Sequence, residues 1–524
     1  MKAVLEGNRV ALYFSFDLAI ITYIKDNIPD RAWNVKTHPK VWSVPASPYH
    51  CTQIIEVLQP IGFYIDPKIV QCADPNESKP NLRKQVPTNL YEYQKEGVEF
   101  IYAAKGRAIV GDAPGVGKSA QALVFANMFG GSKILIVAPQ NVIWKWATKE
   151  AGLWAEGRTV QVVENGKQKI VGADITIMSY GIMVSRYEEL IALPFDTMIF
   201  DEAHYLKSSK SQRNKVARKL TKGVPHLLFL TGTAFKNKRI EMFQLLHMLD
   251  RNQWSSAIEF GKRYCGGVFG QGHWITPPEG ETNTEELQRR LSPILLRRTK
   301  RQIGDQIPEL TRVAIPMNLD NDADYDKALE DARREARREG YKPAFALSLL
   351  NKLRQIVGRG KVKAAIEYAE DILESGEKVV LFAHHKEIVS QLKQHFWKAG
   401  IGTGVIDGST PAKERQRLAD LFLVDSGLEI MIISSAGREG IDLYSANQLI
   451  FVERLWTPAD EEQIEARLQR DGQRNPVTAH YLVAKGTVDE RLDEIVRGKR
   501  AEFANLIQSD IIREIYSDEL LGEE

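Results

Sequence analysis

The sequence predicts an α/β protein in which two tandem parallel-sheet lobes with helical insertions follow a small α+β N-terminal domain. Three observations predict this fold. Between about residues 90 and 300, short apolar runs alternate with helical patterns, and each run leads into a polar loop. The same pattern restarts near residue 311 and continues to about residue 485. Before both, the first 70 residues mix short β-like runs with two apolar helical stretches.

The N-terminal region is expected to form a domain of its own. Its predicted strands are Val10–Phe16, Trp42–Val44 and Phe63–Ile65, and its predicted helices are Leu18–Asp26 and Cys51–Leu58. A polar, proline-bearing stretch follows and indicates a linker. We therefore place an accessory domain at residues 1–75 and a linker at residues 76–88.

The two lobes are predicted from their buried strands. In the first lobe these are Ala108–Val110, Ile134–Val137, Ile175–Met178, Met198–Phe200 and Leu227–Leu230. In the second they are Val379–Phe382, Gly404–Ile406, Ile430–Ile433, Leu449–Val452 and Thr478–Val483. The long, charged and mostly helical stretch between the two sets must include insertions on the lobes. The predicted boundaries are residues 89–310 for lobe 1, 311–488 for lobe 2 and 489–524 for a helical tail.

The composition suits a well-cored protein whose bulk charge does not attract nucleic acid. The chain has 524 residues, is 43% hydrophobic and carries a net charge of +2, so nucleic-acid binding would depend on local basic patches. Its 3 cysteines lack zinc-ligand spacing, which predicts free thiols. No apolar run approaches the roughly 18 residues that span a bilayer, and the N-terminus has no signal-peptide pattern. We expect a cytoplasmic protein, or a nuclear one if the source has a nucleus, that does not bind membranes.

A glycine-rich loop, Asp112-Ala-Pro-Gly-Val-Gly-Lys-Ser119, follows the first buried strand and precedes a helical pattern. Strand, glycine-rich loop and helix in this order predict a phosphate-binding loop whose N–H groups face phosphate oxygens. Its predicted nucleotide-binding residues are Gly115, Val116, Gly117, Lys118 and Ser119. The lysine would supply positive charge, and the serine hydroxyl a ligand for Mg²⁺. Asp112 stands where the strict pattern has glycine.

An acidic DEAH sequence, Asp201-Glu-Ala-His204, directly follows the predicted strand Met198–Phe200. Asp201 at the end of a strand can hold Mg²⁺ together with Ser119, and Glu202 can orient the attacking water. The alternative is an acidic turn that caps a helix by chance, and the phosphate loop upstream argues against it.

A third element lies far along the chain, where Gln463, Arg467 and Arg470 fall at i, i+4 and i+7 of a predicted helix. They would share one face and present two arginines to a γ-phosphate from the opposite lobe. A solvated helix face, salt-bridged by nearby glutamates, is the alternative. We expect ATP and Mg²⁺ as cofactors, with Lys118, Glu202 and the two arginines as catalytic residues.

Together these motifs resemble the superfamily-two helicases, and among them the Swi/Snf-type double-stranded DNA translocases with RecA-like lobes. The resemblance covers about residues 90–485, and the motifs stand in the family's order. Residues 90–94 are similar to the adenine-reading motif, which implies base contacts by Tyr93 and Gln94. Residues 230–237 are similar to the motif that couples hydrolysis to lobe movement, which implies this role for Thr231 and Thr233.

Four further motifs resemble the family's DNA-contacting loops and stand at residues 138–146, 382–385, 406–410 and 434–443. With the coupling motif, they imply DNA contacts by Asn141, Trp144, Lys145, Lys236, His384, Gly408, Ser409, Ser435 and Gly437. The sequence departs from the family's usual residues at Asp442 and Asp471, and Ser119 replaces the commoner threonine.

The HepA-related, annealing-helicase branch is the nearest in pattern. Residues 260–265 and 283–287 resemble this branch, and residues 30–44 look like its HARP domain. Trp33 and Trp42 would then stack on exposed bases of a fork, but they would equally suit a small core.

Basic residues cluster directly after the DEAH sequence: Lys207, Lys210, Arg213, Lys215, Arg218, Lys219 and Lys222. Contact with DNA phosphates and an ordinary solvated helix are both open. A second run, Arg297–Arg301, forms another predicted patch near the lobe boundary.

The predicted function is an ATP-dependent double-stranded DNA translocase that remodels forked or branched DNA, by strand annealing or fork reversal. Three alternatives stay open: a motor that removes proteins from nucleic acid, a strand-separating helicase and a nucleotide-gated DNA-binding scaffold. The expected partner is duplex, forked or branched DNA, and the sequence does not identify protein partners.

Overall fold

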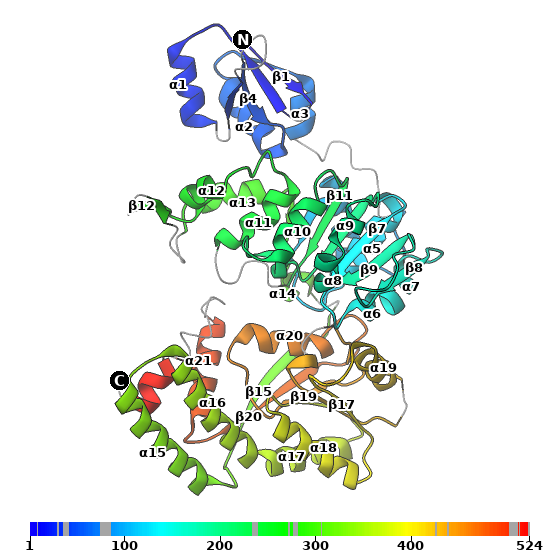
Figure 1. The fold of residues 1–524 in the computed structure, drawn as a ribbon, viewed down its shortest axis with the longest axis vertical. Coiled ribbons are helices and arrows are strands. Elements are labelled where there is room, and N and C mark those ends of the chain that lie inside the picture. Colours follow the sequence, from blue (N-terminus) through cyan, green and yellow to red (C-terminus); the bar gives the residue numbers. More distant parts are fainter. Residues whose placement is uncertain are drawn as a thin grey trace.

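The computed structural model describes residues 1–7, 9–28, 31–34, 41–73, 85–232, 239–270, 273–275, 281–304, 307–424, 427–437, 440–501, 512 and 514–521. Along the long axis of the molecule, the N-terminal domain, the first lobe and the second lobe follow one another (Figure 1). Each lobe has a parallel sheet with helices around it, so the predicted fold class is confirmed.

The N-terminal domain is a five-stranded sheet with three helices. Its elements are β1 (Lys2–Glu6), β2 (Arg9–Tyr13), α1 (Leu18–Asn27), β3 (Ala32–Asn34), β4 (Val41–Pro45), α2 (Pro48–Leu58), β5 (Tyr64–Ile65) and α3 (Pro67–Ala73). Trp42 packs partly buried against the core, whereas Trp33 is 46% exposed, with 5.3 Å between the two ring centroids. Of the two roles open for this pair, Trp42 takes the core role and Trp33 stays accessible.

Lobe 1 has a seven-stranded parallel sheet in the order β14-β6-β11-β10-β7-β9-β8. The strands are β6 (Arg107–Val110), β7 (Ile134–Ala138), β8 (Val160–Val163), β9 (Ile175–Ser179), β10 (Thr197–Asp201), β11 (His226–Leu230) and β14 (Leu295–Leu296). The helices of the sheet layers are α4 (Glu92–Ala103), α5 (Lys118–Phe129), α6 (Ile143–Lys145), the π-helix η2 (Trp146–Glu150), α7 (Ala151–Trp154), α8 (Tyr180–Ser185), α9 (Tyr187–Leu190), the 3₁₀ helix η3 (Ala203–Leu206) and α10 (Gln212–Leu220).

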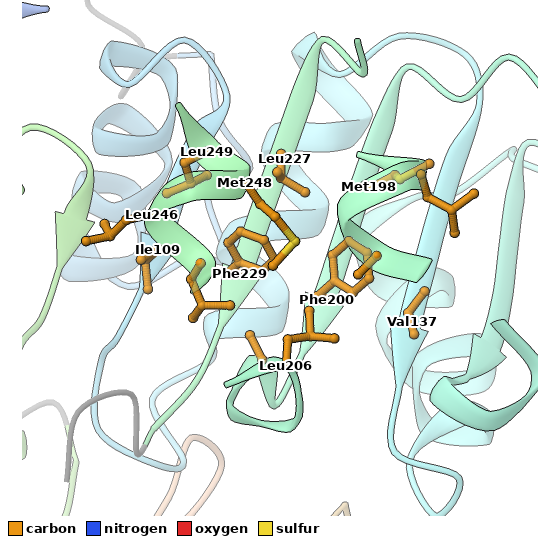
Figure 2. Close-up of a cluster of buried hydrophobic side chains, with 14 of the residues drawn as sticks. Ile109, Val137, Met198, Phe200, Leu206, Leu227, Phe229, Leu246, Met248 and Leu249 are labelled. Carbon is orange, nitrogen blue, oxygen red and sulfur yellow. The ribbon is translucent and has the colours of Figure 1, made fainter. Parts of the chain in front are cut away.

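Both faces of this sheet are covered, which explains why its strands are continuous apolar runs. Successive residues of a strand point to opposite faces. Phe200 and Phe229 therefore join one core, and Ile199 and Leu228 join the other. Figure 2 shows the first core, where side chains from β6, β7, β10 and β11 meet those of α11 (Arg239–Leu249).

Lobe 1 also carries an insertion with α11, α12 (Ala257–Tyr264), β12 (Val268–Gly270), β13 (His273–Ile275) and α13 (Thr284–Leu291), followed by α14 (Lys300–Ile303). The N-terminal domain adjoins this insertion (Figure 1). The guanidinium of Arg290, on α13, lies 5.3 Å from the ring centroid of Tyr49 on α2 and 4.2 Å from that of Trp254. Burial and the nearby Glu286 raise the pKa of Tyr49 to about 12. These contacts join the N-terminal domain to the insertion.

Lobe 2 has a six-stranded parallel sheet in the order β15-β20-β19-β16-β18-β17. Its elements are β15 (Leu310–Met317), α15 (Asp322–Glu339), α16 (Pro343–Gly360), α17 (Val362–Glu374), β16 (Val379–Phe382), α18 (Lys386–Lys398), β17 (Thr403–Ile406), α19 (Ala412–Leu423), β18 (Ile430–Ile433), the 3₁₀ helix η5 (Ser435–Gly437), β19 (Gln448–Phe451), α20 (Pro458–Leu468), β20 (Val477–Ala484), α21 (Val488–Ala501) and the π-helix η6 (Tyr516–Leu521). Residues of α21 and η6 share a core with α15 and α16, so the tail packs onto the insertion of lobe 2. Within the described ranges, none of the helices combines the length and apolarity needed to cross a membrane.

Candidate nucleotide-binding site

A pocket between the lobes collects three of the predicted elements. Lobe 1 contributes the phosphate loop, which follows β6, and the acidic pair, which lies at the carboxyl end of β10. Lobe 2 contributes Gln463, Arg467 and Arg470. Functional loops at the carboxyl ends of parallel strands are typical of such sheets.

The phosphate loop has the backbone of an anion-binding turn. Gly115 and Gly117 have φ angles of +86° and +77°, a conformation that side chains other than glycine rarely adopt. The Nζ of Lys118 donates hydrogen bonds to the carbonyl oxygens of Asp112 at 2.9 Å and Ala113 at 3.1 Å. Burial lowers the pKa of Lys118, although nearby carboxylates oppose that shift. The lysine is therefore held at the loop by weak neutral acceptors that an anion can replace.

The predicted coupling loop adjoins the phosphate loop. A Cβ atom at Gly232 would lie 2.9 Å from the Cγ of Pro114 and 3.5 Å from the Nζ of Lys118. Thr231 is fully buried and its N–H donates to the carbonyl oxygen of Val110. Thr233 and Lys236 lie outside the described residues, so their predicted roles stay predictions.

The acidic pair at the end of β10 is buried and asymmetric. Asp201 accepts hydrogen bonds from the indole N–H of Trp146 and from the N–H of Glu202, each at 2.9 Å. Burial, and then the neighbouring Glu202, raise the pKa of Asp201 to about 6. Burial also opposes the charge of Glu202, but His204, whose Nδ1 lies 3.1 Å from its Oε2, helps to lower its pKa. Glu202 is also one of three non-glycine residues with positive φ among those described, a strain that is common at functional sites.

The arginine element differs from its prediction in one respect. The helix α20 ends at Leu468, so Arg470 lies beyond it instead of at i+7 of one helical face. The chain turns there because its next residues pack on the phosphate loop: a Cβ atom at Gly115 would lie 3.1 Å from the carbonyl oxygen of Gln469. Arg467 and Arg470 still line the same pocket, together with Gln463.

The predicted base-binding residues lie behind the phosphate loop. Gln94 is buried, and its side chain accepts from the N–H of Tyr91 at 3.1 Å and donates to the carbonyl oxygen of Val116 at 3.4 Å. Tyr93 stacks on Tyr91 with ring centroids 5.7 Å apart. Arg298 lies 5.5 Å from the ring centroid of Tyr93.

Arg298 contacts the phosphate loop, which the sequence did not reveal. Its Nη2 pairs with Oδ2 of Asp112 at 2.6 Å, which explains why the loop tolerates an acid in place of glycine. Arg298 therefore turns inward and does not contribute to the predicted basic patch Arg297–Arg301, in which Arg297 is exposed. Lys300 also turns inward, donating to the side-chain oxygen of Gln469 at 2.7 Å.

Two predicted DNA-contacting residues are not on the surface. Lys145 is 8% exposed because its Nζ pairs with Oδ1 of Asp442 at 2.9 Å. Gly437 is buried, and a Cβ atom there would lie 2.9 Å from the Cβ of Ile433. In this arrangement of the lobes, neither the Lys145 side chain nor Gly437 can touch DNA directly, so both predicted contacts are wrong for it.

The other predicted DNA-contacting residues are at least partly accessible. Those at the carboxyl ends of lobe 2 strands are exposed: His384, Gly408, Ser409 and Ser435. Asn141 and Trp144 are half-buried, and the Trp144 ring lies under Lys413 of lobe 2, 5.5 Å from the ring centroid to Nζ. In the basic run, Arg218 is half-buried against His247, and the rest is exposed on or beside α10.

The chain is similar to known proteins over most of its length. Residues 93–357 match the SNF2-related domain, and residues 361–472 match the helicase conserved C-terminal domain. A Caenorhabditis elegans protein, the SWI/SNF-related matrix-associated actin-dependent regulator of chromatin subfamily A-like protein 1 homolog, is 29% identical and covers 94% of this chain and 74% of its own. The mouse DNA annealing helicase and endonuclease ZRANB3 is 29% identical and covers 78% of this chain and 40% of its own.

Among solved structures, the Sulfolobus solfataricus SWI2/SNF2 ATPase core in complex with dsDNA is 25% identical, covers 83% of this chain and 97% of its own, and has a TM-score of 0.40. The chain spans about three quarters of the nematode relative but 52% of the Xenopus tropicalis protein of the same subfamily and 40% of the mouse relative.

Proposed function

Because this chain belongs to the SNF2-related family, we propose that it is a DNA-dependent ATPase that translocates on double-stranded DNA and remodels forked or branched substrates by strand annealing or fork reversal. One observation supports ATP hydrolysis above all: the phosphate loop and the acidic pair of one lobe line the same pocket as two arginines of the other. The relative named as an annealing helicase supports the choice of substrate.

The pocket fits a nucleoside triphosphate with Mg²⁺. Within the part of the chain that the structure describes, Oε1 of Gln463 and Nε of Arg470 are buried in this region without a hydrogen-bond partner. Buried polar atoms of this kind call for a polar ligand. Cations for phosphates and oxygen ligands for a hard metal ion are both present in the lining.

The pocket residues of lobe 1 would then have distinct roles in binding and hydrolysing the nucleotide. Lys118 would exchange its two carbonyl acceptors for phosphate oxygens. Ser119 and Asp201 would hold Mg²⁺, which when bound neutralises phosphate charge. Glu202, ionised at neutral pH, would orient the attacking water and accept its proton. Trp146 fixes the carboxylate of Asp201 through its indole N–H.

Lobe 2 makes turnover depend on the position of the lobes. Arg467 and Arg470 add positive charge where the transferred phosphoryl group develops negative charge. Since they come from the opposite lobe, hydrolysis requires closure and product release permits opening. Alternation between the closed and the open arrangement of the lobes would move the protein along DNA.

The DNA track is proposed along the exposed carboxyl ends of lobe 2 strands. His384 and Ser435 lie side by side there, with 3.3 Å between Nδ1 and Oγ, and Ser409 follows β17. Small polar groups and exposed lysines of α10 suit phosphate contacts, which carry no sequence information. Trp33 of the N-terminal domain offers an accessible ring for stacking on unpaired bases at a fork.

The test is ATP hydrolysis by the wild type and by Lys118→Ala and Glu202→Gln, without DNA and with single-stranded, duplex and forked DNA. We expect stimulation by duplex and more by forks, and loss of turnover by about 100-fold or more in both variants. Asp196→Asn is the control, because this carboxylate precedes β10 at the end away from the pocket.

Trp33→Ala separates the two parts of the proposal. It should reduce stimulation by forks while leaving stimulation by plain duplex intact. If no form of DNA stimulates ATP turnover, the proposal that the protein translocates on DNA is refuted. Unchanged turnover in Glu202→Gln would refute the assignment of Glu202 as the catalytic base.

A further inference from the structure

One buried carboxylate joins the two lobes. Asp442, in the loop after β18, is 1% exposed and lies against three cations. Its Oδ1 pairs with Nζ of Lys145 at 2.9 Å and with Nη1 of Arg470, and its Oδ2 pairs with Nζ of Lys149. The two lysines belong to α6 and η2 of lobe 1, and the arginine belongs to lobe 2.

The surroundings show that the lobes touch at this point. Gly440, two residues before Asp442, has a φ angle of +81°, and a Cβ atom there would lie 1.9 Å from Cγ1 of Val142 in lobe 1. The Nζ of Lys149 also lies 5.1 Å from the ring centroid of Tyr444 in lobe 2. The carboxylate is thus enclosed by both lobes instead of facing water.

The contact between the lobes depends on the negative charge of Asp442. Burial alone would raise its pKa, yet Arg470, Lys145 and Lys149 hold that pKa well below its ordinary value. Without the carboxylate, the three cations would repel one another at close range in a poorly solvated place. Lys145 has a second, weaker partner in Glu150 at 3.8 Å, but that residue lies on the same lobe.

We propose that Asp442 is an interlobe positioning residue that closes the lobes before nucleotide arrives and aims Arg470 at the pocket. Its carboxylate draws Lys145 and Lys149 to lobe 2 and fixes the guanidinium of Arg470, a pocket-lining residue whose Nε is buried without a hydrogen-bond partner among the described residues. The role of Arg470 in hydrolysis rests on the proposed function, whereas closure of the free protein does not.

The distance between the lobes in the nucleotide-free protein is the first measurement. Dyes on Lys169→Cys in lobe 1 and Lys398→Cys in lobe 2, both exposed positions, report it by single-molecule energy transfer, with the half-exposed Cys72 replaced by serine. The wild type should show mainly one high-transfer population. Asp442→Asn, which keeps the shape but removes the charge, should move most molecules to lower transfer.

Two further variants separate charge from packing. Asp442→Glu should retain much of the high-transfer population because it restores the charge. Glu150→Gln should leave the distribution unchanged, because it neutralises a partner of Lys145 within one lobe. Equal distributions for the wild type and Asp442→Asn, or an equal shift in Glu150→Gln, would overturn the proposal whether or not the protein hydrolyses ATP.

Turnover then tests the positioning of Arg470. Asp442→Asn should lower kcat by about tenfold or more while changing KM for ATP by less than about threefold, because a transition-state contact is affected. A raised kcat would show that Asp442 holds Arg470 away from the nucleotide, and it would overturn the proposal that Asp442 positions this arginine for hydrolysis. Absence of turnover in the wild type would contradict the proposed function alone, since the energy-transfer result stands without it.

Discussion

Replacing Asp201 with asparagine is predicted to abolish ATP turnover and, at the same time, to stabilise the nucleotide-free protein. Burial, with the adjacent Glu202, raises the pKa of this carboxyl from 3.8 to about 6. A carboxyl whose pKa is raised by folding favours the protonated state. Its contribution to stability is therefore complete below about pH 4 and is lost as the pH rises through about 6. At pH 7.5 the folded protein bears the full cost of the buried charge.

The magnitude follows from the shift and from two hydrogen bonds. The rise of the pKa from 3.8 to about 6 corresponds to about 3 kcal/mol. Asparagine has one acceptor oxygen for the two donors that Asp201 now satisfies, the indole N–H of Trp146 and the N–H of Glu202. Loss of one such bond costs about 1 kcal/mol. We expect Asp201→Asn to raise the free energy of unfolding by about 2 kcal/mol at pH 7.5.

Urea unfolding at pH 7.5 and near pH 4, without nucleotide or Mg²⁺, measures this difference. The gain should be present at pH 7.5 and disappear near pH 4. Asp196→Asn is the matched control, since the Asp196 carboxylate accepts from the N–H groups of Ser132 and Lys133 and its pKa is lowered. That variant should be less stable than the wild type at pH 7.5. An Asp201→Asn protein that is also less stable at pH 7.5 would refute the reasoning.

Arg454→Met should lower the free energy of unfolding by about 3–5 kcal/mol, because it leaves the fully buried Glu461 and Asp493 without their shared guanidinium; an unchanged urea midpoint would contradict this. Gly115→Ala should reduce ATP turnover by about tenfold or more, since its φ angle of +86° and the close carbonyl of lobe 2 both exclude a methyl group; normal turnover would show that the lobes do not pack there during hydrolysis. Lys215→Ala should lower the slope of log affinity for duplex DNA against log salt concentration by about 1, as expected for one phosphate contact; an unchanged slope would place that exposed lysine off the track.

The fold could be predicted because both sheets are covered on both faces. Strands buried on two sides must be apolar at every position, and such runs are visible in a sequence. The strands that escaped prediction lie at or near sheet edges or are very short. β14 has two residues, Leu295–Leu296, and joins the sheet only by pairing with β6, which lies far earlier in the chain. No local pattern encodes a partner at that separation.

The phosphate loop, the acidic pair and the arginine element could be found because each is a local sequence pattern. Their shared pocket followed from the order of the motifs. The sequence could not show which cations stay at the surface, because ion pairs depend on distant residues. Lys145 and Asp442 are 297 residues apart, and Arg298 and Asp112 are 186 apart.

These two pairs share a physical logic. In both, an acid stands where the motif usually has an uncharged residue, and in both it is buried. A buried carboxylate is costly unless a cation accompanies it, so such a departure implies a cation withdrawn from elsewhere in the chain. Arg298 and Lys145 are those cations: the first belongs to the predicted basic patch Arg297–Arg301, and the second to a motif that resembles a DNA-contacting loop. In a chain with a net charge of +2, the buried acids among those that depart from a motif, Asp112 and Asp442, therefore indicate which basic residues are not available to DNA.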